Sequence, residues 1–166
     1  MSKIALDRLR EKFGSEIIDT HAHHGDETAI LKPARLVEIC TFLRDDEVTS
    51  FEMLMDLTGG DVLGHKEPRF EVVYHLYSLT KRHRLRLKVP CPDDENPVVP
   101  SVLGVWKSAN WMEREAWDLY GIKFDGHPDL RRVLLYPEFE GHPLRKDYEM
   151  EKRQPIVPPW PGRQHL

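Results

Sequence analysis

The sequence lacks length, cysteine pairs and long apolar runs, and each absence removes a class of protein. Its 166 residues are fewer than the about 250 that an eight-stranded α/β barrel needs. Cys40 and Cys91 are too far apart in the sequence for a zinc knuckle or a disulfide framework. No apolar run approaches the roughly 20 residues of a membrane-spanning helix. We therefore expect a chain that stays in the cytoplasm and has no direct membrane span.

A positive charge excess is also missing. The chain has 24 Lys and Arg against 28 Asp and Glu, for a net charge of -4. No global basic field attracts nucleic acid, so we expect no nucleic-acid partner. Since 40% of the residues are hydrophobic and 31% are charged, the composition indicates a globular domain with appendages.

Most catalytic motifs are absent from the sequence. It has no Gly-rich phosphate loop, no Gly-x-Ser-x-Gly and no Cys-x-x-Cys. One cluster remains, because His21 and His23 would lie on the same side of a strand and could hold a divalent metal. A small metal-dependent hydrolase that uses these two residues is therefore the alternative function. The competing interpretation is a strand end rich in histidine that faces solvent.

Hydrophobic periodicity predicts an α/β (α+β) fold, in which a small, mostly antiparallel sheet packs against helices. Apolar residues at helical spacing predict helices over 1–14 and 33–46. Strands are predicted at 16–23, 27–31, 51–58, 70–77 and 84–89. In the third strand, Phe51, Met53, Met55 and Leu57 are expected to share one side. In the last strand, Arg84, Arg86 and Lys88 are expected to face water.

A helix with unusual composition is predicted over 111–120. Asn110 is expected to be its N-cap, with Glu113 completing a capping box, and Gly121 is expected to end it. Its side chains include four charges and three large aromatic rings. Arg114 and Asp118 are at i and i+4 and are predicted to pair. Just upstream, we expect Ser101 to cap a short helix that runs through Trp106.

The last part of the chain is rich in proline and reads as an extended tail. Seven of the 13 prolines lie in the last 39 residues. We therefore divide the chain into a domain over 1–125 and a tail over 126–166 that docks on partner subunits. The tail repeats itself, since residues 126–132 (GHPDLRR) are followed by 141–147 (GHPLRKD). Each copy either fastens the tail to its own domain or latches onto a neighbouring chain.

These residues also carry a resemblance to a known family. The run 111–132, followed by 141–148, resembles the C subunit of respiratory complex I, also called the 30 kDa subunit of NADH:quinone oxidoreductase. Residues 70–76 and 100–102 fit the same family pattern more loosely. The resemblance marks these positions as the candidate subunit interface: Glu113, Arg114, Glu115, Asp118, Tyr120, Gly121, Gly126, His127, Pro128, Asp129, Leu130, Arg131, Arg132, Gly141, His142, Pro143, Leu144, Arg145, Lys146, Asp147 and Tyr148.

The resemblance implies a non-catalytic structural subunit in the peripheral arm of a proton-translocating complex. That complex passes electrons from NADH to quinone and uses FMN and iron-sulfur clusters, and this protein is expected to bind none of these and to contain no catalytic residue. Its expected partners are other complex I subunits, especially the 49 kDa subunit of the quinone pocket and the subunit that holds the terminal cluster. Its expected place is the cytoplasmic side of the inner membrane, as a peripheral protein.

Other features leave part of this assignment open. Related sequences also occur in membrane-bound hydrogenases, so an equivalent subunit of such a complex is a further alternative with another electron donor. The sequence also departs from the family pattern at two places. Glu149 stands where relatives usually have proline. At Gly59-Gly60, before Asp61, the family more often has a small apolar pair, so we expect a looser loop there.

Overall fold

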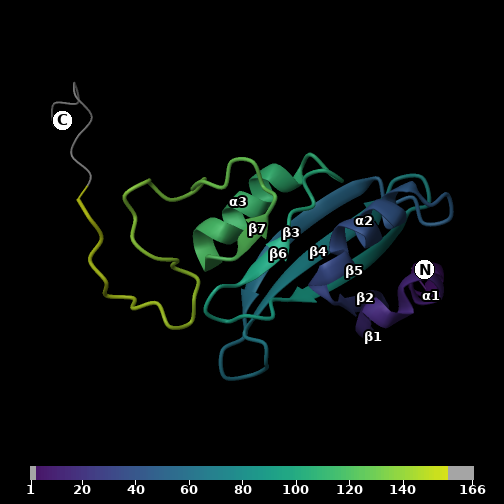
Figure 1. Cartoon of the computed structure of the whole chain (residues 1–166), viewed down its shortest axis with the longest axis horizontal. Helices are drawn as coiled ribbons and strands as arrows, with labels where there is room; N and C mark the ends of the chain where they lie inside the picture. Colours follow the sequence, from purple (N-terminus) through teal and green to yellow (C-terminus); the bar gives the residue numbers. More distant parts are fainter. Residues whose placement is uncertain (1–2, 157–166) are drawn as a thin grey trace.

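A five-stranded sheet and the helices packed on it form the body of the protein (Figure 1). The computed structural model describes residues 3–156. The helices are α1 (Lys3–Phe13), α2 (Leu36–Asp45) and α3 (Ala109–Tyr120), with short 3-10 turns η1 (Gly14–Glu16) and η2 (Pro33–Arg35). The strands of the large sheet are β1 (Ile17–His23), β2 (Asp26–Leu31), β3 (Met53–Asp61), β4 (Phe70–Ser78) and β5 (His83–Pro90).

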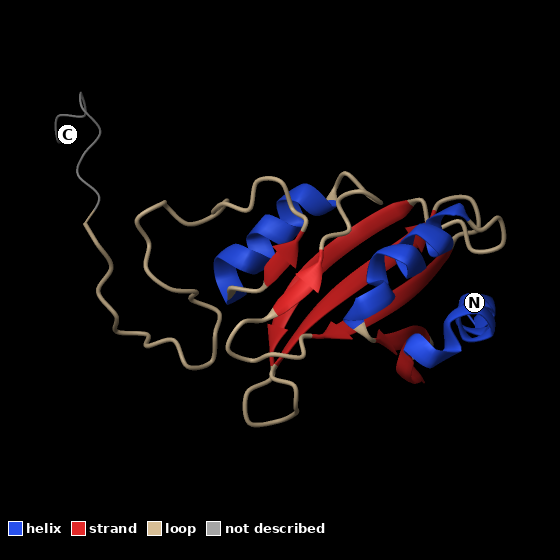
Figure 2. Cartoon of the chain, in the orientation of Figure 1, coloured by secondary structure: helices blue, strands red, loops and turns tan. Residues whose placement is uncertain are grey.

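The sheet is mostly antiparallel, as predicted. Its strand order is β1-β2-β5-β4-β3, and only the central β2–β5 pair is parallel. A second, two-stranded parallel sheet joins β6 (Val98–Pro100) to β7 (Lys123–Asp125). The predicted α/β class is therefore confirmed. Figure 2 shows that the described chain after β7 is a long loop.

The hydrophobic core lies on one face of the sheet. Alternate residues of β4 and β5 are buried there, among them Tyr74 and Leu87, together with the apolar sides of all three helices. The alternate side chains of β5 point to the other face, where Arg84 is exposed and Arg86 and Lys88 are partly exposed. This arrangement confirms that the basic side of β5 faces water.

Strand β3 differs from its predicted pattern. Its pairing with β4 shifts register between Leu54 and Asp56. The irregularity changes which side chains point inward, so Leu54 is buried while Met53 and Met55 are 43% and 40% exposed. The prediction that both methionines share the buried side is therefore wrong.

The Gly59-Gly60 pair lies within β3, so the expected looser loop is also wrong. A Cβ atom at Gly59 would lie 2.7 Å from Cδ2 of Tyr120 in α3. Glycine at this position therefore lets the tyrosine ring approach the strand closely. This close approach is one of the contacts through which α3 packs against β3.

Both cysteines are free and buried. Cys40 lies in the buried stripe of α2. Burial raises the pKa of the Cys40 thiol strongly and that of Cys91 to about 12. Because the thiolate is the reactive form, both side chains are inert hydrophobic groups at neutral pH.

Candidate functional site: helix α3 and the segment after it

Helix α3 places three charged side chains inside the protein. Glu113, Arg114 and Asp118 are 0%, 7% and 0% exposed. A buried charge is strongly unfavourable without a partner, so each must find one. The predicted Arg114–Asp118 pair is not among the ion pairs of the described residues. Both side chains turn instead to the segment that follows the helix.

The Asp118 carboxylate binds a short stretch of this segment. Its Oδ1 lies 2.7 Å from Nη1 of Arg132. Its Oδ2 accepts the backbone N–H groups of Val133, Leu134 and Leu135 at 3.0, 2.9 and 3.0 Å. Burial alone would raise the pKa of Asp118, but these N–H groups and Arg132 outweigh it and lower the pKa. Asp118 is therefore ionised, and it anchors the stretch from Arg132 to Leu135 to α3.

Arg114 holds the same stretch one helical turn earlier. Its guanidinium donates from Nε and Nη2 to the carbonyl oxygens of Arg131 and Arg132, both at 3.1 Å. It also lies over the ring of Trp111, at 4.9 Å from the centroid. The main chain of the first repeat is thus fixed along α3.

The second repeat caps the C-terminal end of α3. A helix leaves its last four carbonyl groups without intrahelical donors. Here each accepts a donor from Gly121 or from the second repeat. The donor–acceptor pairs are Gly121 N to Trp117 O (2.8 Å), His142 Nδ1 to Asp118 O (2.9 Å), Leu144 N to Leu119 O (3.0 Å) and Arg145 Nε to Tyr120 O (2.6 Å).

Gly121 is required for this cap. Its φ of 75° is in the left-handed region, which favours glycine. A Cβ at this position would lie 2.5 Å from Nη2 of Arg145 and 2.6 Å from the ring of His142. The predicted end of the helix is therefore confirmed, and the glycine also makes room for the second repeat.

An ion network fastens the second repeat to the sheet. Arg69 Nη2 lies 2.7 Å from both Asp61 and Asp147, and Asp61 also accepts the backbone N–H of Lys146 at 2.8 Å. Burial would raise the pKa of Asp61, but Arg69 and the backbone donors lower it to about 2. Sequence reasoning missed Arg69, because its partners lie 8 and 78 positions away.

The first repeat divides into inward and outward groups. His127 bonds the carbonyl of Asn110 at 3.3 Å, and Leu130 packs against the core. Arg132 also donates to the carbonyls of Phe139 and Gly141, so it links the two repeats. Arg131 points outward, since its side chain is 71% exposed and pairs with exposed Asp129.

The beginning of α3 differs from the prediction. The helix starts at Ala109, and Ser108 at the N-cap position makes no capping hydrogen bond. Glu113 does not form a capping box with Asn110. Its carboxylate accepts hydrogen bonds from Ser101 Oγ at 2.6 Å and from the Val102 N–H at 2.7 Å. Burial raises the pKa of Glu113 to about 7.

Two further predictions, one for the chain before α3 and one for β1, have different outcomes. The expected short helix after Ser101 is a turn, although Ser101 Oγ does accept the N–H of Leu103 at 3.2 Å. His21 and His23 do share a side of β1, with ring centroids 4.3 Å apart. Within residues 3–156, no group of three His, Cys, Asp or Glu side chains could hold a metal ion.

The outer surface of this region is partly apolar. Tyr148 turns inward and stacks on Phe139 at 6.3 Å. Among the remaining positions predicted as a subunit interface, Tyr120 and Pro143 are half-buried. The exposed ones are Glu115, Gly126, Pro128, Asp129, Arg131, Gly141, Leu144, Lys146 and Asp147. The exposed large apolar side chains here are Trp111, Leu134, Leu144, Met150 and Ile156. We call this set the C-terminal apolar surface.

These contacts define a class of protein. It is a small α/β protein whose charged C-terminal segment is fastened to its last helix, while large apolar side chains face outward. The interpretation that both repeats fasten the segment to its own domain agrees with every contact described above. Docking of the same segment on partner subunits stays a prediction, as does the division of the chain at residue 126. Residues 157–166 of the predicted tail lie outside the described residues.

The chain belongs to the family described as "Respiratory-chain NADH dehydrogenase, 30 Kd subunit", whose model matches residues 29–154. It is 49% identical over 142 residues to the NADH-quinone oxidoreductase C subunit 2 of Rhizobium etli, covering 86% of this chain and 74% of the relative. It is 44% identical over 159 residues to the NADH-quinone oxidoreductase C subunit of Geobacter sulfurreducens, covering 96% and 95%. It is thus a subunit of an oxidoreductase complex, and the resemblance in its sequence is confirmed.

Solved structures agree with the fold. The trypsin-resistant fragment of Nqo5 matches with a TM-score of 0.65 and 34% identity, covering 75% of this chain and 98% of that one. An archaeal membrane-bound sulfane sulfur reductase matches with a TM-score of 0.74 over 90% and 86% of the chains. At 21% identity, the second match concerns the fold alone. The comparisons support the complex I assignment and neither the metal hydrolase nor the hydrogenase alternative.

Proposed function

We propose that this protein is a non-catalytic assembly subunit in the peripheral arm of a proton-translocating NADH-quinone oxidoreductase. A catalytic acid or base must reach its substrate. Glu113 and Asp118, the carboxylates in α3 that are fully buried, are occupied by contacts within the chain. Asp118 sets the shape of the segment after α3, and Glu113 holds the turn that precedes the helix. The electron carriers FMN and iron-sulfur clusters then belong to other subunits.

The C-terminal apolar surface carries this proposal. Trp111, Leu134 and Leu144 are 62%, 61% and 46% exposed, and Met150 and Ile156 are almost fully exposed. Large exposed apolar side chains are candidate contacts for a partner protein, and tryptophan is frequent among the residues that dominate binding. Neighbouring subunits covering this region would bury these side chains.

The partners proposed are the 49 kDa subunit, which forms the quinone pocket, and the terminal-cluster subunit, which holds the last iron-sulfur cluster. The names of the relatives support an assembly of this type. Within residues 3–156, no helix is long and apolar enough to cross a membrane. We propose that the chain reaches the cytoplasmic side of the inner membrane as a peripheral protein, through these partners.

Co-purification from membranes tests the proposal. An affinity-tagged chain, expressed in its own host and extracted in mild detergent, should bring down the 49 kDa and terminal-cluster subunits, identified by mass spectrometry. Trp111→Ala combined with Leu134→Ala should reduce their recovery about tenfold or more, because hot-spot side chains contribute at least about 2 kcal/mol each. Leu79→Ala is the matched control, since Leu79 is 59% exposed in the β4–β5 turn.

The isolated chain provides the second half of the test. Its absorption spectrum should show neither flavin nor iron-sulfur bands. The isolated chain should neither oxidise NADH nor reduce quinone. Turnover by the isolated chain would overturn the non-catalytic role. Recovery of the two partner subunits that is unchanged by the Trp111 and Leu134 substitutions would overturn the assignment of the surface.

A further inference from the structure

The last described part of the chain forms a loop whose two ends are joined to each other. The Tyr136 hydroxyl donates to the carbonyl oxygen of Pro155 at 3.0 Å. The side-chain amide of Gln154 accepts the backbone N–H of Glu140 at 2.8 Å and donates to its carbonyl oxygen at 3.1 Å. We call residues 136–155 the closed loop. It lies beyond α3, at the end of the molecule away from α1 (Figure 1).

Aromatic side chains pack against one another inside the closed loop. The ring centroid of Phe139 lies 5.6 Å from that of Tyr136 and 6.3 Å from that of Tyr148. The Tyr148 hydroxyl accepts a hydrogen bond from the Gln154 amide. Arg132, whose guanidinium is paired with α3, lies over Phe139 at 5.6 Å from its centroid. The loop therefore has a small core of its own, and that core is fastened to α3.

Met150 is 99% exposed in a turn of the closed loop. The turn is closed by the N–H of Lys152, which donates to the carbonyl oxygen of Glu149 at 3.1 Å. Glu149 and Glu151 stand on either side of Met150, and both are exposed. Lys152 lies 3.6 Å from Glu140, but neither Glu149 nor Glu151 has a cation within ion-pair distance among the described residues. The turn therefore presents one apolar side chain between two carboxylates.

We propose that the closed loop is a preformed docking element, and that Met150 enters an apolar pocket with a basic rim on a neighbouring protein subunit. The thioether side chain of methionine adapts to pockets of irregular shape, so it suits such a contact. This inference rests on the proposed function, because it needs the chain to be part of an assembly. It names the kind of partner that one part of the C-terminal apolar surface takes.

The two glutamates decide the shape and the charge of the partner. A flat apolar surface over Met150 would also cover the carboxylates of Glu149 and Glu151, and burial of an ionised carboxylate without a partner is costly. A pocket takes up the Met150 side chain alone, and basic side chains at its rim pair with the carboxylates. The phosphates of an anionic membrane would repel both glutamates. The occupant is therefore a protein.

Closure of the loop before docking is tested in the isolated full-length chain. A loop that already has its shape loses less freedom on binding, so more of the contact energy appears as affinity. Gln154 controls the shape, because it bonds both backbone groups of Glu140. Deuterium exchange at the Glu140 N–H should be about tenfold faster or more in Gln154→Ala than in the wild type. Equal exchange in the two chains would overturn the preformed loop.

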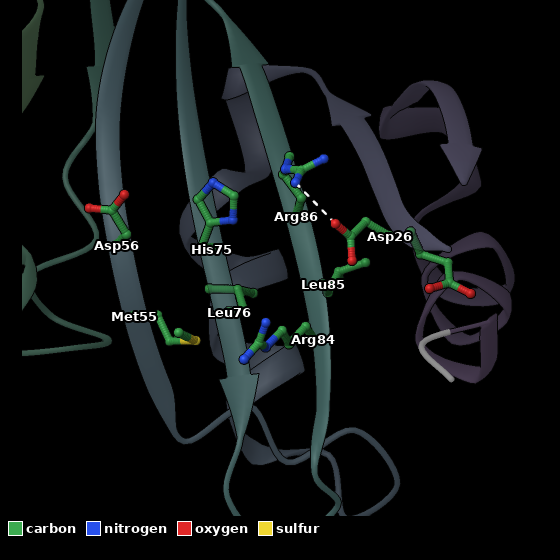
Figure 3. A pocket seen from close by; sticks show the side chains of 9 residues that line it. Asp26, Met55, Asp56, His75, Leu76, Arg84, Leu85 and Arg86 are labelled. Atoms are coloured by element: carbon green, nitrogen blue, oxygen red, sulfur yellow. Dashed lines mark ion pairs between the residues drawn. The ribbon is translucent and has the colours of Figure 1, made fainter. Parts of the chain in front are cut away.

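Substitutions of Met150 in the native assembly test the pocket. Met150→Ala should lower the recovery of the chain in the purified complex about tenfold, because it removes most of the buried apolar area. Met150→Leu keeps the volume, so recovery should stay within about threefold of the wild type. Met55→Ala is the matched control. Met55 is 40% exposed, and Figure 3 shows it on β3 in a hollow that Asp56 and Arg84 also line.

Neutral substitutions test the basic rim. Glu149→Gln combined with Glu151→Gln should lower recovery about threefold or more, because both carboxylates lose their charge-assisted partners. Arg153→Gln removes one charge from an exposed position after the turn, and its recovery should stay within about twofold of the wild type. A larger loss for Arg153→Gln than for the glutamate pair would show an acidic rim and would overturn the proposed partner chemistry.

A crosslink identifies the occupant. A diazirine analogue of methionine at position 150, in the assembled complex, should crosslink to another subunit close to a Lys or Arg of that subunit. Unchanged recovery of Met150→Ala, a crosslink to a second copy of this chain, or Met150-dependent binding to phosphatidylglycerol vesicles would each overturn the inference. Failure of the wild-type chain to co-purify with any oxidoreductase subunit would overturn the proposed function itself.

Discussion

The carboxylate of Asp118 and the guanidinium of Arg132 lie 2.7 Å apart, and their side chains are 0% and 14% exposed. The same guanidinium donates to carbonyl groups at residues 139 and 141. One buried pair therefore connects helix α3, the first repeat and the beginning of the second. Residues 126–156 keep their course because of this connection, although this described stretch contains no helix or strand.

Removal of the anchor should loosen the whole segment. Asp118→Ala leaves Arg132 and three backbone N–H groups without their acceptor, so we expect a loss of about 3–5 kcal/mol in the free energy of unfolding. Urea denaturation measures this loss. Asp129→Ala, which removes an exposed pair, should change stability by less than about 1 kcal/mol. Equal effects of the two variants would contradict the anchoring role.

The two repeats should differ in their response to arginine removal. Arg145 donates to the last carbonyl of α3 at 2.6 Å, so Arg145→Ala should destabilise the protein by about 1.5–3 kcal/mol, the range for a hydrogen bond from a charged group. Arg131→Ala should leave the melting temperature almost unchanged, because its side chain is 71% exposed. Differential scanning calorimetry compares the two. A larger shift for Arg131→Ala would contradict the geometry.

Glu113 should make stability depend on pH near neutrality. Its pKa is raised by burial from 4.5 to about 7, so folding favours the protonated form. This contribution is fully present below pH 4.5 and is lost as the pH rises to about 7. The loss is about 3 kcal/mol, since one pKa unit corresponds to about 1.4 kcal/mol. Burial keeps Cys40 and Tyr74 neutral in this range, because it raises the pKa of both.

Glu113→Gln removes this titration and retains the acceptor for the Val102 N–H. The variant should be more stable than the wild type above pH 7, and the slope of unfolding free energy between pH 5 and about 7.5 should flatten. Glu115→Gln, at an exposed position of the same helix, is the control and should leave the slope unchanged. An unaltered slope in Glu113→Gln would show that another group is responsible.

The sequence predicted elements that depend on local patterns. Amphipathic spacing located α2, and alternation located β4 and β5. The left-handed conformation of Gly121 followed from its position directly after the predicted helix over 111–120. These features are encoded within a few residues, where steric and burial preferences act directly.

The wrong predictions concern side chains for which residues distant in the sequence compete with neighbours in the helix or strand. Asp118 has Arg114 one turn away, yet Arg132 and three backbone N–H groups outcompete it. Glu113 bonds Ser101 and Val102 and not Asn110, because burial against the preceding turn leaves no water to solvate it. The bulge near Met55 depends on pairing with β4. These pairings depend on which residues the tertiary structure brings together, and the hydrophobic periodicity of one sequence carries no information about that.

The capped end of α3 also bears on how this family adapts to new assemblies. Because the four terminal carbonyls already accept donors from this chain, a neighbour there meets few open main-chain acceptors. Discrimination between neighbours then depends on side-chain shape and charge, which single substitutions alter without disturbing the backbone. Related complexes could diverge in composition by surface replacements alone, while the scaffold beneath stays the same.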